Sequence, residues 1–153
     1  MIKIFSSEQV KKADLFTIQN EPVKSIDLME RAANECFNWL KKFNSLADFT
    51  FFVFCGPGNN GGDGLAIARM LKEFGCKLTV IIPDETSQKS VDFAENLLRA
   101  NNCGIQILYL KDAFSINIPK NGLIIDALFG TGLSRSLTGI YAELIELINK
   151  TDC

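Results

Sequence analysis

The feature that most limits the fold is a glycine-rich segment between a buried strand and a helix. Residues 49–55 form an apolar run without polar alternation, which predicts a strand buried on both faces and central in a sheet. The segment 56–64, Gly-Pro-Gly-Asn-Asn-Gly-Gly-Asp-Gly, follows directly. Apolar residues at helical spacing up to Phe74 then predict a helix that stops at Gly75, a favourable residue for a helix C-terminus. The order strand, glycine loop, helix is typical of α/β proteins.

The rest of the chain continues this alternation. Apolar periodicity predicts further helices over residues 26–40, 87–100 and 137–148, and strands over residues 78–82, 105–110 and 123–126. Strands that alternate with helices indicate βαβ crossovers, and therefore a mostly parallel central sheet with helices on both faces. A length of 153 residues with 47% hydrophobic content suits one domain over residues 1–153.

The glycine loop favours ligand binding over a merely structural turn. Gly56, Gly58 and Gly61 match G-x-G-x-x-G, in which missing side chains let a pyrophosphate approach a helix N-terminus. Gly62 and Asp63 stand where a P-loop needs lysine and a hydroxyl residue, which argues against an NTPase. Two roles stay open for Asp63, because an acid in a first helical turn can act in catalysis or only stabilise the helix dipole.

A second loop, residues 126–136, follows the predicted strand 123–126. Ligands of open α/β sheets bind beyond the carboxyl ends of the strands, so we expect both loops to flank one pocket. Asp126 ends its strand as a partly buried carboxylate that serves as a ligand for a hard cation or as a general base. The alternative is a structural Asp126 that accepts hydrogen bonds from nearby backbone amides.

Composition excludes several classes of function. The chain has no histidine, which rules out Ser-His-Asp and Cys-His catalysis and histidine-ligated zinc. Its five cysteines form no Cys-x-x-Cys pair and suit reduced thiols. A net charge of −2 predicts no nucleic-acid or membrane partner, and the doublets Lys11-Lys12 and Lys41-Lys42 are interpreted as solvated surface. Without a signal peptide or membrane span, we expect a soluble, cytoplasmic protein.

With these motifs in place, the chain resembles the NAD(P)H-hydrate epimerase family, whose domain is also called the YjeF N-terminal domain. The matching segments, in the family's order, are Ser7-Glu8-Gln9, residues 25–32 with Leu28-Met29-Glu30-Arg31-Ala32, residues 56–64 and residues 126–134. The resemblance implies a Rossmann-like three-layer αβα sandwich. It also implies an isomerase that interconverts the R and S epimers of NADHX and NADPHX, which are reduced nicotinamide dinucleotides hydrated at C6 of the ring.

The resemblance further implies a set of site residues. Asn60 and Asp126 match positions that hold a potassium ion in the family, and Asp126 and Asp63 are both candidates for proton transfer. The substrate would contact residues of both loops, which are Asn59, Asn60, Gly61, Gly62, Asp63, Gly130, Thr131, Gly132, Leu133, Ser134, Arg135 and Ser136.

The family's domain continues with another strand and an Asp-x-Pro-Ser-Gly motif, whereas this sequence stops at Cys153. We therefore expect a piece of a longer protein that lacks the C-terminal part of its domain, and in fused members a hydrate dehydratase domain follows. A homodimer is the family expectation. The rival hypothesis is a non-catalytic nucleotide-binding or dimerisation scaffold. A nicotinamide-dependent dehydrogenase is less favoured, because a substrate domain and histidine are missing. The sequence does not distinguish NADHX from NADPHX.

Overall fold

The computed structural model describes residues 4–43, 45–110, 116–131, 133 and 136–152. Helices alternate with strands along most of this chain. The elements are helices α1 (Ser7–Asn20), α2 (Ser25–Leu40), α3 (Asn59–Glu73), α4 (Val91–Asn102) and α5 (Ile140–Lys150), the short 3-10 helix η1 (Leu46–Asp48), and strands β1 (Thr50–Cys55), β2 (Lys77–Ile82), β3 (Ile107–Tyr109) and β4 (Gly122–Ala127).

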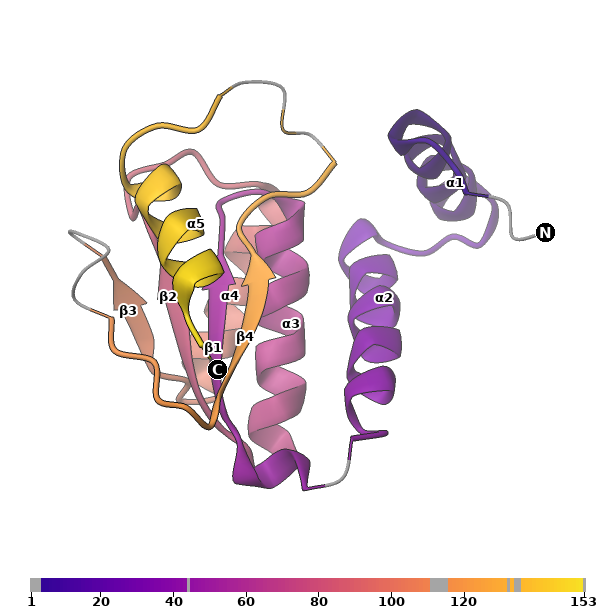
Figure 1. The fold of residues 1–153 in the computed structure, drawn as a ribbon. Helices are drawn as coiled ribbons and strands as arrows, with labels where there is room; N and C mark the ends of the chain where they lie inside the picture. The colour runs from indigo at the N-terminus through magenta and orange to yellow at the C-terminus, as the bar shows by residue number, and fades with distance from the viewer. Residues whose placement is uncertain (1–3, 44, 111–115, 132, 134–135, 153) are drawn as a thin grey trace.

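The described strands form one parallel sheet in the order β3-β2-β1-β4. Helices α3 and α4 cover one face of the sheet, α5 covers the other, and α2 packs on the outer side of α3, as Figure 1 shows. The α/β class and the three-layer arrangement are therefore confirmed, and β1 is an interior strand as predicted.

Strand β1 supplies side chains to both faces of the sheet. Phe51 and Val53 are fully buried in the core that α2, α3 and α4 share. Phe54 points to the opposite face and packs with Leu128 and with Leu144 of α5. An apolar run without polar alternation is what a strand between two helical layers needs, because neither of its faces meets water.

Two helices begin later than their periodicity predicts, and local backbone chemistry explains both. Helix α4 begins at Val91 because the Ser90 side chain accepts a hydrogen bond of 3.2 Å from the backbone N–H of Phe93, which caps the helix. Helix α5 begins at Ile140 because Gly139 has φ of 60°, a left-handed conformation that interrupts any helix from residue 137. The third predicted strand is also shorter, at Ile107–Tyr109.

Helix α1 stands apart from the three layers (Figure 1). Its first turn is closed by a capping box, in which Ser6 and Gln9 exchange hydrogen bonds of 2.8 and 3.3 Å. None of its residues is buried, so the packing of α1 adds little to the core. Among the described residues, no helix is long and apolar enough to cross a membrane.

Candidate functional site

The two glycine-rich loops leave the sheet side by side. Strands β1 and β4 are parallel neighbours with Cys55 opposite Ala127, and the backbone N–H of Gly56 donates to the Ala127 carbonyl at 3.0 Å. A cavity of about 980 Å³ opens between the loops beyond this point. The prediction that both loops flank one pocket is therefore confirmed.

Close backbone packing accounts for the glycines at the base of the first loop. A Cβ atom at Gly56 would collide with the carbonyl of Leu128, and one at Gly61 would collide with the carbonyl of Gly56. A Cβ at Gly64 would lie 2.6 Å from the Cβ of Ala127, so this glycine lets α3 approach the sheet. These three positions have a packing role whatever the cavity binds.

The start of α3 opens toward the cavity. Gly58 occupies the N-cap position without a side-chain cap, and a Cβ there would meet nothing within 4 Å. The first backbone bond of the helix runs from the Gly62 N–H to the Gly58 carbonyl at 3.1 Å. The preceding N–H groups are left for an outside acceptor, and such a helix start attracts anions.

Asn60 connects the two loops. Its Nδ2 donates a hydrogen bond of 3.0 Å to the backbone carbonyl of Phe129 across the cavity floor. The side chain is half-buried and lines the cavity. This bond fixes the amide orientation and leaves Oδ1 as an acceptor or metal ligand.

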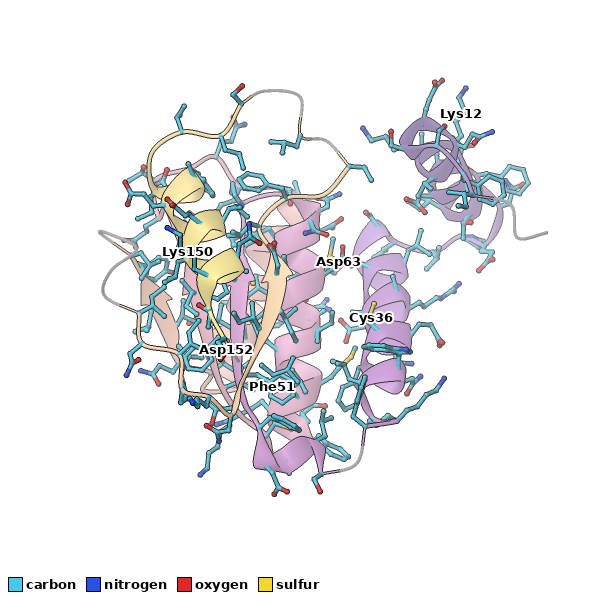
Figure 2. All side chains as sticks on the ribbon, viewed as in Figure 1. Lys12, Cys36, Phe51, Asp63, Lys150 and Asp152 are labelled. Carbon is cyan, nitrogen blue, oxygen red and sulfur yellow. The ribbon has the colours of Figure 1, made fainter. Side chains whose placement is uncertain are left out.

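Asp63 lies in the first turns of α3 and lines the same cavity (Figure 2). Burial raises the pKa of its carboxyl group to about 6, with further contributions from the negative charges of Asp14 on α1 and Asp92 on α4. Asp92 is itself fixed by a hydrogen bond of 2.6 Å from the Ser25 hydroxyl. A carboxyl group that titrates near neutral pH is suited to both accepting and donating a proton. The expectation of an acid in the first helical turn is wrong, because α3 begins at Asn59 and has no acidic residue in its first turn, so a role of Asp63 in stabilising the helix dipole loses its basis.

Asp126 differs from the expectation of a partly buried acid. It is exposed, because β4 is an edge strand among the described residues, and it is not one of the residues that line the cavity. Its Oδ1 accepts a hydrogen bond of 3.0 Å from the backbone N–H of Leu128. This is the contact expected of a structural acid, although Oδ2 stays available for a further ligand.

Asn60 and Asp126, the two residues expected to hold a potassium ion, both bond to the backbone of the loop after β4. Asn60 bonds to Phe129 and Asp126 bonds to the adjacent Leu128, so an amide oxygen and a carboxylate oxygen belong to one small region. Both are hard oxygen ligands. Among the described residues, no group of three or more histidine, cysteine, aspartate or glutamate side chains is arranged to hold a metal ion.

Most of the predicted substrate contacts reach the cavity. Gly61 and Gly62 are buried and do not line it, and Gly132, Ser134 and Arg135 lie outside the described residues. The predicted residues that line the cavity are Asn59, Asn60, Asp63, Gly130, Thr131, Leu133 and Ser136.

Sequence reasoning missed three groups of lining residues. Helix α1 contributes Val10, Lys11 and Asp14, the segment before α4 contributes Ser87 and Gln88, and the region around the start of α5 contributes Thr138, which precedes the helix, and Tyr141 in its first turn. No local pattern marks them, because α1 is separated from the first loop by the whole of α2. The Lys11-Lys12 doublet was interpreted as solvated surface, and both residues are exposed as expected, but Lys11 also lines the cavity.

Comparison with known proteins agrees with this arrangement. The model of the family "YjeF-related protein N-terminus" matches residues 25–153. An NAD(P)H-hydrate epimerase of Anaerococcus prevotii is 37% identical in an alignment of 153 positions, gaps included, that covers 97% of this chain and 69% of that protein. One from Limosilactobacillus reuteri is 36% identical, covering 98% of this chain and 69% of that protein.

Two further likenesses extend the comparison. The bifunctional NAD(P)H-hydrate repair enzyme Nnr of Thermofilum pendens is 32% identical over 97% of this chain, which spans 29% of that longer protein. The crystal structure of the yeast protein YNL200c superposes with a TM-score of 0.81 at 24% identity, over 97% of this chain and 65% of the yeast chain. At 24% identity, the likeness to the yeast structure shows a shared fold and nothing further.

Proposed function

The chain belongs to the family of YjeF-related protein N-termini, and on that premise we propose that it is an isomerase that interconverts the R and S epimers of NADHX and NADPHX. The observation that carries the proposal is the shared cavity. Two loops at the carboxyl ends of β1 and β4 enclose it, and Asp63 lines it. The relatives named NAD(P)H-hydrate epimerase are similar over almost all of the chain, including both loops.

The cavity suits a dinucleotide. Its volume of about 980 Å³ is at the upper end of the range for small-molecule sites. The uncapped start of α3 offers backbone N–H groups and a positive dipole end to a pyrophosphate. Gly58 leaves space for the phosphate oxygens to approach that helix start closely.

The proposed chemistry is a loss and return of water at C6 of the reduced nicotinamide ring. The ring nitrogen pushes its electron pair toward C6 as the C–O bond breaks, and the departing hydroxyl takes a proton from the carboxyl group of Asp63 and leaves as water. Water then adds to C6 of the resulting iminium from either face and returns a proton to the Asp63 carboxylate. A pKa of about 6 lets this side chain carry the proton in both directions near neutral pH.

Asp126 remains the second candidate for proton transfer, and with Asn60 it would hold a potassium ion. A bound potassium ion supplies positive charge that orients the loop carbonyls and the substrate. In this role Asn60 joins the two loops through Phe129, whereas Asp126 orders the start of the second loop through Leu128. The proposal also includes a homodimer, action in the cytoplasm, and a hydrate dehydratase domain in a longer protein, as the name of the bifunctional relative suggests.

Epimer exchange tests the function directly. Chromatographically isolated R-NADHX is incubated with protein, with and without potassium, and the appearance of S-NADHX is followed. We expect acceleration by the wild-type protein, loss of activity in Asp63→Asn, and a larger potassium requirement in Asp126→Ala. Absence of acceleration would favour the scaffold hypothesis, as a nucleotide-binding scaffold if NADH or NADPH raises the melting temperature and as a dimerisation scaffold if neither does.

A further inference from the structure

Helix α1 places a lysine on the cavity that no motif of the sequence identifies. Lys11 lines the cavity together with Val10 and Asp14 of the same helix. We infer that the Lys11 ammonium group binds a phosphate group of the dinucleotide substrate. This inference rests on the proposed function and adds to it a residue that determines which ligands bind.

The negative charges in and around the cavity favour a cationic side chain where the phosphates of a dinucleotide would bind. Two acids, Asp14 and Asp63, line it, and Lys11 is the single cationic side chain among the described lining residues. The pyrophosphate of NADHX carries two negative charges, and NADPHX adds a further phosphate. The start of α3 supplies only about half a positive charge. Lys11 would offset most of the remaining charge of the pyrophosphate and reduce its repulsion by the two acids.

Lys11 is available for a ligand in a way that its neighbour is not. Lys12 forms a salt bridge of 2.8 Å with Glu8 on the same helix, and both of those side chains are more than 70% exposed. Among the described residues, none forms a salt bridge with Lys11. Both lysines are exposed to solvent, but only Lys11 lines the cavity.

The placement of α1 supports the same role. The helix buries none of its side chains and packs only lightly against α2. It nevertheless lies toward the end of the sandwich at which β1 and β4 finish (Figure 1), and Val10 and Lys11 stand four and three positions before Asp14, on one side of the helix. Helix α1 therefore contributes charged residues to one side of the cavity, and Lys11 is the cationic residue among them.

The substrate offers two sources of phosphate, the pyrophosphate bridge of both hydrates and the 2′-phosphate that only NADPHX carries. The test therefore compares NADH with NADPH as binding probes in calorimetry, and NADHX with NADPHX in the epimer exchange assay. The variants are Lys11→Gln, Lys11→Arg and the matched control Lys12→Gln, which removes the same charge from the same helix.

We expect Lys11→Gln to weaken binding by about tenfold, to raise KM with little change in kcat, and to reduce the dependence of binding on salt concentration. Lys11→Arg keeps the charge and should stay within about threefold of wild type, as should Lys12→Gln. A loss for both probes assigns Lys11 to the pyrophosphate, and a loss confined to NADPH and NADPHX assigns it to the 2′-phosphate.

Two outcomes would overturn the inference, and they are distinguishable. If wild-type protein epimerises the hydrates but Lys11→Gln and Lys12→Gln behave alike, Lys11 has no phosphate role while the proposed function stands. If wild-type protein neither binds the probes nor accelerates exchange, the proposed function falls and the Lys11 role falls with it.

Discussion

The side-chain amide of Asn60 donates a hydrogen bond of 3.0 Å to the backbone carbonyl of Phe129, and so joins the loop after β1 to the loop after β4. The two residues are 69 positions apart in the sequence. Because both loops line one cavity, this bond controls the separation of its two walls. The geometry of the site therefore depends on one polar side chain that neither loop motif requires for its own turn.

Asn60→Asp tests this connection. A carboxylate cannot donate to the Phe129 carbonyl and brings negative charge against it, so we expect a loss of about 1–3 kcal/mol in the free energy of unfolding and faster hydrogen exchange in residues 128–131. Asn59→Asp is the stability control, because Asn59 is exposed. Equal free energies of unfolding for the two variants, from urea titration, would show that the bond does not hold the loops together.

The glycines of the first loop should respond differently to a single methyl group. Gly61→Ala forces a Cβ against the Gly56 carbonyl, where only backbone movement can relieve the contact, so we expect a loss of more than about 2 kcal/mol in the free energy of unfolding. Gly58→Ala meets no atom within 4 Å and should remain within about 1 kcal/mol of wild type. Thermal and chemical denaturation of both variants measures the difference. A Gly58→Ala variant as unstable as Gly61→Ala would contradict the packing role.

The raised pKa of Asp63 predicts a specific dependence of stability on pH. The folded carboxyl group, with a pKa of about 6, holds its proton more tightly than in the unfolded chain, so its contribution to stability is lost as pH rises from about 4 through 6. Asp63→Asn removes this dependence, and the variant should gain stability relative to wild type between pH 5 and pH 7.5.

Asp84→Asn is the control, because the pKa of Asp84 is shifted in the opposite direction from that of Asp63. Hydrogen bonds from Ser87 and Thr86 lower the pKa of Asp84 to about 2, so its carboxylate stays ionised in both folded and unfolded chains above pH 5. The effect of Asp84→Asn should therefore be constant between pH 5 and pH 7.5. If the Asp63→Asn difference were equally constant, burial of the Asp63 carboxyl group would not be raising its pKa.

A polar network between α2, α3 and α4 gives the last prediction. Glu30 forms a salt bridge with Arg69, whose side chain is only 12% exposed and also donates to the fully buried Asn96 at 3.3 Å. Glu30→Gln leaves the Arg69 charge without its carboxylate, at an expected cost of about 2 kcal/mol in the free energy of unfolding.

The matched control is Glu146→Gln, which breaks the exposed pair with Lys150 on α5. Its cost should stay below about 1 kcal/mol, since both of these side chains are solvated. Urea denaturation of the two variants gives the comparison. Similar costs would mean that water reaches Arg69 well enough to replace Glu30.

The sequence alone was sufficient to predict the three-layer α/β architecture and the tight glycine-rich loop after β1. The apolar run at residues 49–55 has no polar face to present to water, and only a strand between two helical layers accommodates it. The glycine at position 61 follows from sterics within one strand-loop-helix unit, because a Cβ there would meet the Gly56 carbonyl, whereas the need for glycine at position 56 comes from Leu128 of the second loop. The starts of two helices were harder to predict from apolar periodicity. Helix α4 starts where Ser90 caps it, and α5 starts after the positive φ of Gly139.

Only the tertiary structure decided which side chains share the cavity. Lys11 and Asp14 reach it from a helix that precedes the first loop by one complete helix, and Asp14 and Asp92 raise the pKa of Asp63 through space. Likewise, the exposure of Asp126 depends on β4 having no described neighbour on its outer side. Periodicity and steric rules act over a few residues, whereas electrostatic potential and solvent access depend on every element packed nearby, so no local pattern contains them.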